Sequence, residues 1–323
     1  MERNVLEIKN LRTKLVTRKG NLYPVDGVTL AIPKGKIVGL VGESGCGKSM
    51  LANSIMGLLP ENGSIAEGSI TFDSQEFLAL TSEERRKLYG DRLTLIFQEP
   101  MSSLNPVVRV GKQVAEVLKL HSPNLSSSER RKKVVDMFRS VGIPEPEKRY
   151  AAFPHELSGG LRQRVMISAA MIQHPDLLIA DEPTTALDVT IEAQILHLMK
   201  KLQEESGSSV LLITHDLGVV AEICDLVCVM YAGKIVETAD VRELFHHPSH
   251  PYTQGLLKSL PSRNNGKRLE NIPGTVPTLA EMPAGCRFAP RCPYASPSCH
   301  EKLPELIDRG NNHFVRCSHE EDN

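Results

Sequence analysis

Residues 42–49, which read GESGCGKS, have the glycine and lysine spacing of a phosphate-binding loop. Glycines let the backbone wrap closely around an anion, and consecutive N–H groups then point inward at the start of a helix. Lys48 would bring positive charge to the terminal phosphates, and the Ser49 hydroxyl would bind Mg²⁺. The residues predicted to contact a nucleotide such as ATP are Gly42, Ser44, Gly45, Cys46, Gly47, Lys48, Ser49 and Met50. Within this set, Cys46 is interpreted as a small spacer rather than a nucleophile.

The elements that flank this loop support the interpretation. Residues 37–41 read IVGLV, which is typical of a buried strand, and residues 50–59 predict a helix that ends near Pro60. A glycine- and serine-rich turn could match the motif by chance. The strand–loop–helix context favours the phosphate loop over that alternative.

Two adjacent carboxylates follow a second apolar strand. Residues 177–180 read LLIA and run directly into Asp181 and Glu182. Beside a phosphate loop, Asp181 can hold Mg²⁺ through water, and Glu182 can polarise an attacking water as a general base. The alternative is a strand that ends in a solvated acidic turn, and the phosphate loop earlier in the chain argues against it.

Two further strand ends carry polar side chains. Residues 210–214 predict a strand that ends at His215, and residues 93–97 predict one that ends at Gln98. In an open α/β sheet, strand ends of this kind form the ligand site. We therefore expect His215 to contact the terminal phosphate and Gln98 to join the Mg²⁺ and water shell, although a histidine there is often only structural.

A second anion site is predicted where the LSGG segment precedes a helix that starts near Leu161. Ser158 supplies a capping hydroxyl, while Gly159 and Gly160 leave backbone N–H groups uncovered. An ordinary N-capped helix start is the alternative, and an isolated SGG sequence would favour it.

Composition limits the class of protein. The chain has 323 residues, 41% of them hydrophobic, with 38 Lys and Arg against 39 Asp and Glu. About two domains are expected, and the balanced charge argues against a nucleic-acid-binding surface. No run approaches the ~18 apolar residues that span a bilayer, and the start lacks the apolar segment of a signal peptide. We therefore expect a cytosolic location.

The element pattern predicts an α/β fold. Residues 66–72 add a strand, and residues 110–120 and 128–141 have helical spacing inside a helical insertion at about 100–165. Residues 161–214 then alternate helix, strand, helix and strand, which is typical of a parallel sheet covered by helices. After about residue 245 the chain becomes rich in proline and loops.

Four cysteines in this tail predict a metal site. Their spacing is C-x5-C-x6-C-x17-C, for Cys286, Cys292, Cys299 and Cys317. Disulfides are unfavourable in the cytosol, and a metal can supply folding energy that a small core cannot. Zinc prefers closer cysteine pairs, whereas a 4Fe–4S cluster accepts wider spacing. The cluster is therefore favoured, with zinc and free thiols as alternatives.

Six motifs resemble, in their order and spacing over roughly residues 5–240, those of an ABC transporter ATPase. They are the phosphate loop, Gln98, LSGG, the LIADE segment at 178–182, the turn at 186–188 and His215. In that family two ATPase subunits stack head to tail, and the LSGG of one closes over the ATP held by the other. The resemblance implies that Ser158 and Gly160 act on the partner's nucleotide, and that Asp188 in the turn at 186–188 links the two sites. It also implies an adenine-stacking aromatic, for which Tyr23 is the candidate. Leu161 departs from the glutamine that many members have there.

Longer segments narrow this resemblance to the ATPases of bacterial dipeptide and oligopeptide importers. These segments are FQEPMSSLNP at 97–106, HELSGGLRQRV at 155–165, ADEPTTALDVT at 180–190, HPSHPYTQGLL at 247–257 and GCRFAPRCPYASPSC at 285–299. The resemblance implies a P-loop NTPase core of ABC type at residues 1–245, with an antiparallel β subdomain and the helical subdomain. A small C-terminal domain at 246–323 would carry the four-cysteine iron–sulfur site.

The importer resemblance also implies partners and location. The chain would hydrolyse ATP to power peptide import through two permease subunits, together with a second ATPase subunit that is a paralogue or a further copy. A peptide-binding protein would act indirectly, and the chain would lie peripherally on the cytoplasmic face of the membrane. The alternatives are an importer ATPase for nickel or sugars, a soluble ABC-type ATPase of repair or translation, and a regulatory subunit that does not hydrolyse ATP.

Overall fold

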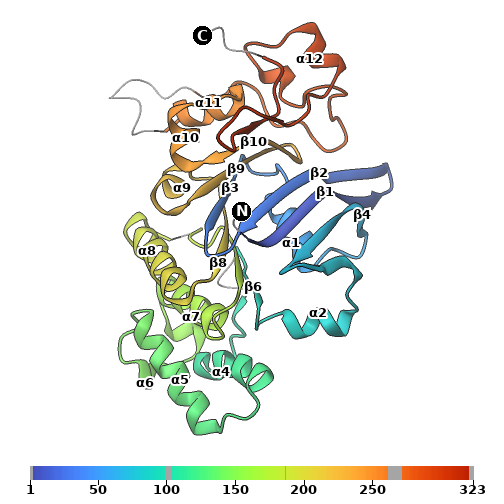
Figure 1. Ribbon diagram of the computed structural model, residues 1–323. Helices are drawn as coiled ribbons and strands as arrows, with labels where there is room; N and C mark the ends of the chain where they lie inside the picture. Colours follow the sequence, from blue (N-terminus) through green and yellow to red (C-terminus); the bar gives the residue numbers. More distant parts are fainter. Residues whose placement is uncertain (1–2, 99–102, 186, 261–270, 320–323) are drawn as a thin grey trace. The chain divides into compact units, whose positions relative to one another are not determined.

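The computed structural model describes residues 3–98, 103–185, 187–260 and 271–319 (Figure 1). These residues form two compact units. We call Met1–Val5, Ile32–Lys36 and Glu76–Leu212 the helical unit, and Leu6–Ala31, Ile37–Gln75 and Ile213–Asn323 the cradle unit. The predictions made for residues 99–102 and 186 lie outside the described residues.

The helical unit consists of a small sheet and of helices that precede and follow its strands. Its strands are β6 (Leu93–Ile96), β7 (Leu177–Asp181) and β8 (Ser209–Thr214), in the order β8-β7-β6. Its helices are η1 (Phe77–Ala79), α2 (Ser82–Leu88), α4 (Val110–His121), α5 (Ser127–Ser140), α6 (Pro146–Arg149), η2 (Pro154–Glu156), α7 (Gly159–Met171) and α8 (Val189–Ser206). Figure 1 shows α4, α5 and α6 grouped together, within the stretch expected to be the helical insertion.

Side-chain caps set where these helices begin. Ser126 caps α5 through the N–H of Glu129, whose carboxylate in turn accepts the N–H of Ser126. Ser158 caps α7 and Asp188 caps α8 in the simpler one-way form. Each cap satisfies an N–H that the first helical turn leaves without a partner.

The cradle unit contains an antiparallel sheet. Its strands are β1 (Asn4–Thr17), β2 (Gly20–Pro33), β4 (Gly63–Phe72) and β5 (Gln75–Glu76), in the order β2-β1-β4-β5. Strand β4 pairs with β1 from Leu6 opposite Phe72 to Leu15 opposite Gly63. This sheet matches the predicted antiparallel β subdomain.

A second sheet in the cradle unit places the phosphate loop. Its strands are β3 (Ile37–Val41), β9 (Leu226–Tyr231), β10 (Lys234–Asp240), β11 (Ile307–Asp308) and β12 (Phe314–Val315), in the order β11-β12-β10-β9-β3. Its helices are α1 (Lys48–Met56), α9 (Leu217–Ile223), α10 (Val241–His246), α11 (Pro251–Lys258), η4 (Ala289–Arg291) and α12 (Pro297–Glu301). Strand β3 is buried along its whole length and pairs in parallel with β9.

The described residues of the C-terminal tail, 246–260 and 271–319, belong to this same compact unit. Strand β12 pairs with β10, and a buried carboxylate reinforces the contact. Glu237 is fully buried and accepts hydrogen bonds from the backbone N–H groups of Ser249 and His250, at 2.7 and 3.0 Å, and pairs with Nε2 of His313 at 2.7 Å. The tail is thus tied to the sheet by both backbone and side-chain contacts.

The predicted elements are present, but their ends differ. Helix α1 begins two residues before the predicted Met50 and ends at Met56, because Gly57 adopts a left-handed conformation with φ of 63° that stops the helix. The helical insertion expected at about residues 100–165 also contains the short helix α6, which the spacing did not predict. In the part of the chain that the structure describes, no helix is both long and apolar enough to cross a membrane.

Candidate functional site

Close backbone approaches explain the glycines of the phosphate loop. A Cβ atom on Gly42 would lie 2.2 Å from the carbonyl oxygen of Met230, and one on Gly47 would lie 2.3 Å from that of Pro24. These distances leave no room for any side chain. The loop can therefore keep its conformation only with glycine at both positions.

Lys48 lies inside the loop. Its side chain is nearly buried, and its Nζ donates to the carbonyl oxygens of Gly42 and Glu43 at 2.8 and 3.2 Å. Ser44 and Ser49 are exposed, as a site for a soluble nucleotide requires. Cys46 is 1% exposed and burial raises the pKa of its thiol, which agrees with its interpretation as a spacer.

The helical unit brings Gln98 and Glu182 together. Strands β6 and β7 run in parallel with Ile96 opposite Ala180, so residues two positions later project from the same sheet edge. Nε2 of Gln98 donates to Oε2 of Glu182 at 2.9 Å. The side-chain amide of Gln98 thus orients the carboxylate that was predicted as the general base.

Glu182 also has a contact that the sequence analysis missed. The Thr185 hydroxyl donates to the same Oε2 at 3.0 Å, and Glu182 itself adopts a left-handed backbone conformation with φ of 44°. The turn is held on its other side by Thr184, which donates to Oε1 of Glu192 at 2.6 Å. Two adjacent threonines that follow the strand-end carboxylate pair after one proline were the available signal.

The LSGG segment packs against the start of α8. Oγ of Ser158 accepts from the N–H of Leu161 at 3.4 Å, and Oδ1 of Asp188 accepts from the N–H of Ile191 at 3.0 Å. A Cβ on Gly160 would lie 2.8 Å from Cγ2 of Ile191. Gly160 is therefore needed for this close packing, whatever ligand its N–H binds.

Two predicted site residues lie elsewhere in the cradle unit. His215 follows β8 and is exposed. The ring of Tyr23 is covered by the guanidinium of Arg12, which lies 3.9 Å from the ring centroid. Their predicted roles in phosphate contact and adenine stacking stay predictions, as does Mg²⁺ binding by Ser49, Gln98 and Asp181.

The four tail cysteines line one hollow in the cradle unit, together with His250 and His319. All seven cysteines of the chain are free thiols. Across the described residues, however, no three His, Cys, Asp or Glu side chains form a group that could hold a metal ion. The described residues therefore do not contain the predicted metal site as a group of side chains already arranged around one ion.

The thiols nevertheless influence one another electrostatically. Burial raises the pKa of Cys292 to about 11, and the negative charge of Cys317, Cys286 and Cys299 adds to the rise. Burial likewise raises the pKa of Cys286 and Cys317, whereas a hydrogen bond with the Ser296 hydroxyl lowers that of Cys299. In the absence of a nearby cation, three of these thiols are therefore held in the protonated form.

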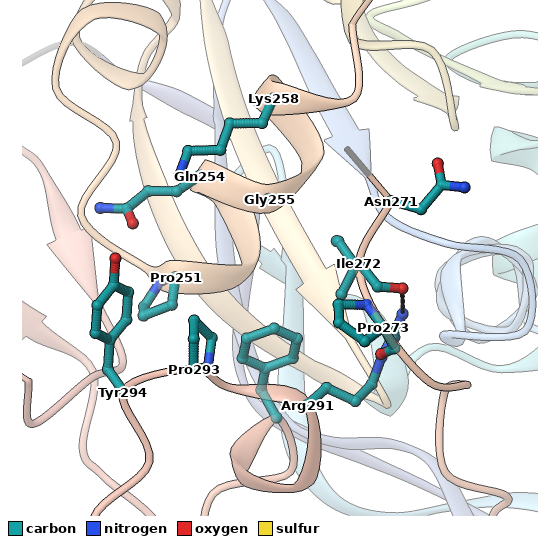
Figure 2. A pocket seen from close by; sticks show the side chains of 11 residues that line it. Pro251, Gln254, Gly255, Lys258, Asn271, Ile272, Pro273, Arg291, Pro293 and Tyr294 are labelled. Carbon is teal, nitrogen blue, oxygen red and sulfur yellow. Dashed lines mark hydrogen bonds between the residues drawn. The ribbon is translucent and has the colours of Figure 1, made fainter. Parts of the chain in front are cut away.

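A second pocket, of about 130 Å³, lies in the tail beside α11 (Figure 2). Pro251, Gly255, Pro273, Phe288 and Arg291 are among the residues that line it. Nothing in the sequence pattern predicted it. Its wall includes Arg291, a side chain that also reaches the phosphate loop.

Comparison with known proteins identifies the family. Residues 25–185 match the family described as ABC transporter, and residues 236–299 match the oligopeptide/dipeptide transporter C-terminal region. The oligopeptide transport ATP-binding protein AppD of Bacillus subtilis is 49% identical over 315 residues, which cover 97% of this chain and 96% of that protein. This chain belongs to the ABC transporter family, among the oligopeptide and dipeptide transport ATP-binding proteins. The dipeptide transport ATP-binding protein DppD of Bacillus subtilis is a further member, 47% identical over 97% of this chain and 94% of its own length.

Solved ABC cassettes confirm the P-loop ATPase fold. A dimeric ATP-binding cassette in a post-hydrolysis state, bound to ADP and Pi, is similar with a TM-score of 0.66 and 29% identity, covering 73% of this chain and 99% of that one. A cassette from the cbiONQ transporter complex of Clostridium perfringens has a TM-score of 0.63 and 27% identity, covering 76% and 92%. Both place this member of the ABC transporter family among ATPases whose fold is known from experiment.

Proposed function

We propose that this chain is the ATP-hydrolysing subunit that powers import of dipeptides or oligopeptides across the cytoplasmic membrane. The observation that carries the proposal is similarity over the whole chain, tail included, to relatives named as oligopeptide and dipeptide transport ATP-binding proteins. ATPases for nickel or sugar import, or for repair and translation, share the cassette. The oligopeptide/dipeptide transporter C-terminal region at residues 236–299 favours peptide import over these alternatives.

The residues named in the sequence analysis supply the parts of a hydrolysis reaction. The N–H groups of the phosphate loop and Lys48 bind the β- and γ-phosphates, and Glu182, oriented by Gln98, accepts a proton from the attacking water. Ser49 and Asp181 would hold Mg²⁺, which neutralises charge on the phosphates when it is bound. His215 contacts the γ-phosphate.

Assembly completes the site. In this proposal the Ser158 and Gly160 backbone of one ATPase subunit closes over the nucleotide of the other, and Asp188 links the two sites. The second ATPase subunit is a paralogue or a further copy, and the pair lies peripherally on two permease subunits at the cytoplasmic face, served by a peptide-binding protein. A dimeric cassette bound to ADP and Pi among the similar structures supports this arrangement.

The direct test of this function is whether peptide bound to its binding protein stimulates ATP hydrolysis by the assembled transporter. Stimulation is the expected result. A transporter that hydrolyses ATP at one rate with and without peptide would contradict the proposal.

We further propose that Cys286, Cys292, Cys299 and Cys317 together bind a 4Fe–4S cluster, with zinc as the alternative. Thiolates of such a cluster bind different irons, so four sulfurs around a hollow need not converge on one ion. The donor chemistry fits, because a bound cation would stabilise the thiolate forms that burial disfavours.

His250 supplies a second observation that fits a bound group. Its Nδ1 accepts from the N–H of Tyr252 at 3.1 Å, so the hydrogen of the neutral ring lies on Nε2. Nε2 is buried without a hydrogen-bond partner among the described residues, in a side chain that lines the same hollow. A buried N–H of this kind is costly unless an acceptor is present, and a cluster sulfur is such an acceptor. When bound, the group would supply folding energy to the tail.

The metal content of the purified full chain tests this site. We expect about four irons per chain with matching sulfide, and brown protein that absorbs at about 400 nm, all lost in Cys292→Ser. Cys224→Ala serves as the control, because Cys224 is buried outside the hollow. Colourless protein with stoichiometric zinc would show that the site binds zinc rather than a cluster. Protein that contains neither metal would contradict the proposed site.

A further inference from the structure

Two residues of the tail hold the phosphate loop directly, and both contact Glu43. The Glu43 N–H donates to Oη of Tyr252 at 2.9 Å. Nη1 of Arg291 donates to both carboxylate oxygens of Glu43, at 3.0 and 3.1 Å. Because Lys48 bonds the Glu43 carbonyl oxygen, this loop residue is fixed through its N–H, its C=O and its side chain.

Arg291 is itself rigidly placed. Its side chain is 5% exposed. Nε donates to the carbonyl oxygen of Pro273 at 2.8 Å and Nη2 to that of Ile272 at 3.3 Å, on the wall of the pocket in Figure 2. Nη1 also lies 3.4 Å from Oη of Tyr231. Because the guanidinium is fixed by these tail carbonyls, it also fixes the position of the Glu43 carboxylate relative to the tail.

Tyr252 is equally constrained. It is fully buried, and its ring lies edge-on to that of Tyr231, with centroids 4.6 Å apart, and 5.4 Å from that of Phe288. The hydroxyl cannot leave Glu43 unless this aromatic cluster rearranges. Such clusters resist rearrangement, because a close-packed core tolerates little change in volume.

A second connection reaches the other end of the loop. Arg287 of the tail donates to the carbonyl oxygen of Ala232 and pairs with Asp26. The next residue, Gly233, donates its N–H to the carbonyl oxygen of Cys46 at 2.7 Å. The tail segment 286–292 therefore supports the loop at Glu43 directly and at Cys46 through one intermediate turn.

We propose that Tyr252 and Arg291 are positioning residues for ATP binding, acting on the phosphate loop through Glu43. The loop binds phosphate with backbone N–H groups. If the loop had to become ordered only when the anion binds, the cost of that ordering would weaken binding, so contacts that fix the N–H directions beforehand increase affinity. This inference rests on the proposed nucleotide site at residues 42–49. It assigns the tail a function in nucleotide affinity, in addition to any bound metal.

The dissociation constant of MgATP for the full chain tests the inference. Tyr252→Phe, which removes one hydroxyl, is expected to raise the Kd about three- to tenfold, the cost of one lost hydrogen bond. Arg291→Met is expected to raise it at least as much. In the assembled transporter the KM for ATP rises, while the rate at saturating ATP returns to the wild-type value. Tyr294→Phe is the matched control, an exposed tail tyrosine whose variant should bind as wild type.

A double-mutant cycle separates positioning from a general effect on tail folding. If Arg291 acts through Glu43, then Arg291→Met should add nothing to the Kd in a Glu43→Ala background, where no side-chain acceptor for Arg291 is left at position 43. Additive effects on the Kd would contradict the inference, and so would wild-type Kd values for both Tyr252→Phe and Arg291→Met. Either result would leave the proposed nucleotide site unaffected. The Lys48→Ala variant tests the nucleotide site itself. If the wild-type chain binds no MgATP, or if Lys48→Ala binds it as tightly as wild type, then the assignment of the nucleotide site is wrong, and the inference that rests on it is wrong as well.

Discussion

Glu182→Gln should lower kcat for ATP hydrolysis by about 10²–10⁴-fold, the range expected for loss of a general base. The amide has nearly the shape of the carboxylate and can still accept the hydrogen bonds from Gln98 and Thr185, which lie at 2.9 and 3.0 Å from Oε2. It cannot take a proton from the attacking water. ATP affinity should therefore be retained while turnover stops, so that the variant accumulates as a stable ATP-bound pair.

Two measurements on the assembled transporter check this expectation. Steady-state phosphate release gives kcat, and size-exclusion chromatography with MgATP shows whether the two ATPase subunits stay paired. Glu205→Gln is a matched control, because Glu205 lies on α8 with an exposed carboxylate that pairs with the exposed Lys201 at 3.8 Å. If Glu182→Gln hydrolyses ATP at the wild-type rate, Glu182 is not the base.

Lys48→Ala should raise the Kd for MgATP by about 10- to 100-fold, which is the worth of a charged hydrogen bond. Lys48 is 5% exposed and its ammonium lies beside the loop carbonyls of Gly42 and Glu43, so its loss removes both a positive charge near the phosphates and support for the loop. Binding should weaken much more than in any single tail variant.

Equilibrium binding of a fluorescent ATP analogue to the full chain measures this effect. The melting temperature without nucleotide must be recorded alongside, because loss of the loop contacts also affects stability. Lys48→Arg keeps the charge but changes its geometry, and we expect an intermediate Kd. A Kd for Lys48→Ala equal to that of wild type would remove residues 42–49 from the nucleotide site.

Sequence patterns predicted the elements that carry local chemistry. The apolar run at β3 and the run at β7 are continuous and buried, so their strand character and the loops after them could be read from spacing alone. The meeting of Gln98 and Glu182 followed from parallel strands ending at one edge. The end of α1 could not be placed, because it depends on the conformation of Gly57.

Contacts between distant segments had no sequence signal. Tyr252 and Arg291 reach Glu43 across 209 and 248 residues, and their spacing along the chain gives no indication of it. Residues 247–257 contributed only to the family resemblance, yet Tyr252 within them accepts a hydrogen bond from the phosphate loop. The four thiols line one hollow, but the cysteine spacing could not show that, among the described residues, no three His, Cys, Asp or Glu side chains form a group able to hold a metal ion.

The most direct test of the account is ATP hydrolysis by the complete transporter in proteoliposomes, measured with and without its binding protein loaded with a dipeptide or oligopeptide. The account predicts that peptide-loaded binding protein accelerates hydrolysis, and that Glu182→Gln in this chain abolishes the acceleration. A hydrolysis rate that does not respond to peptide, or that responds only to nickel or a sugar, would contradict the central claim that this chain powers peptide import.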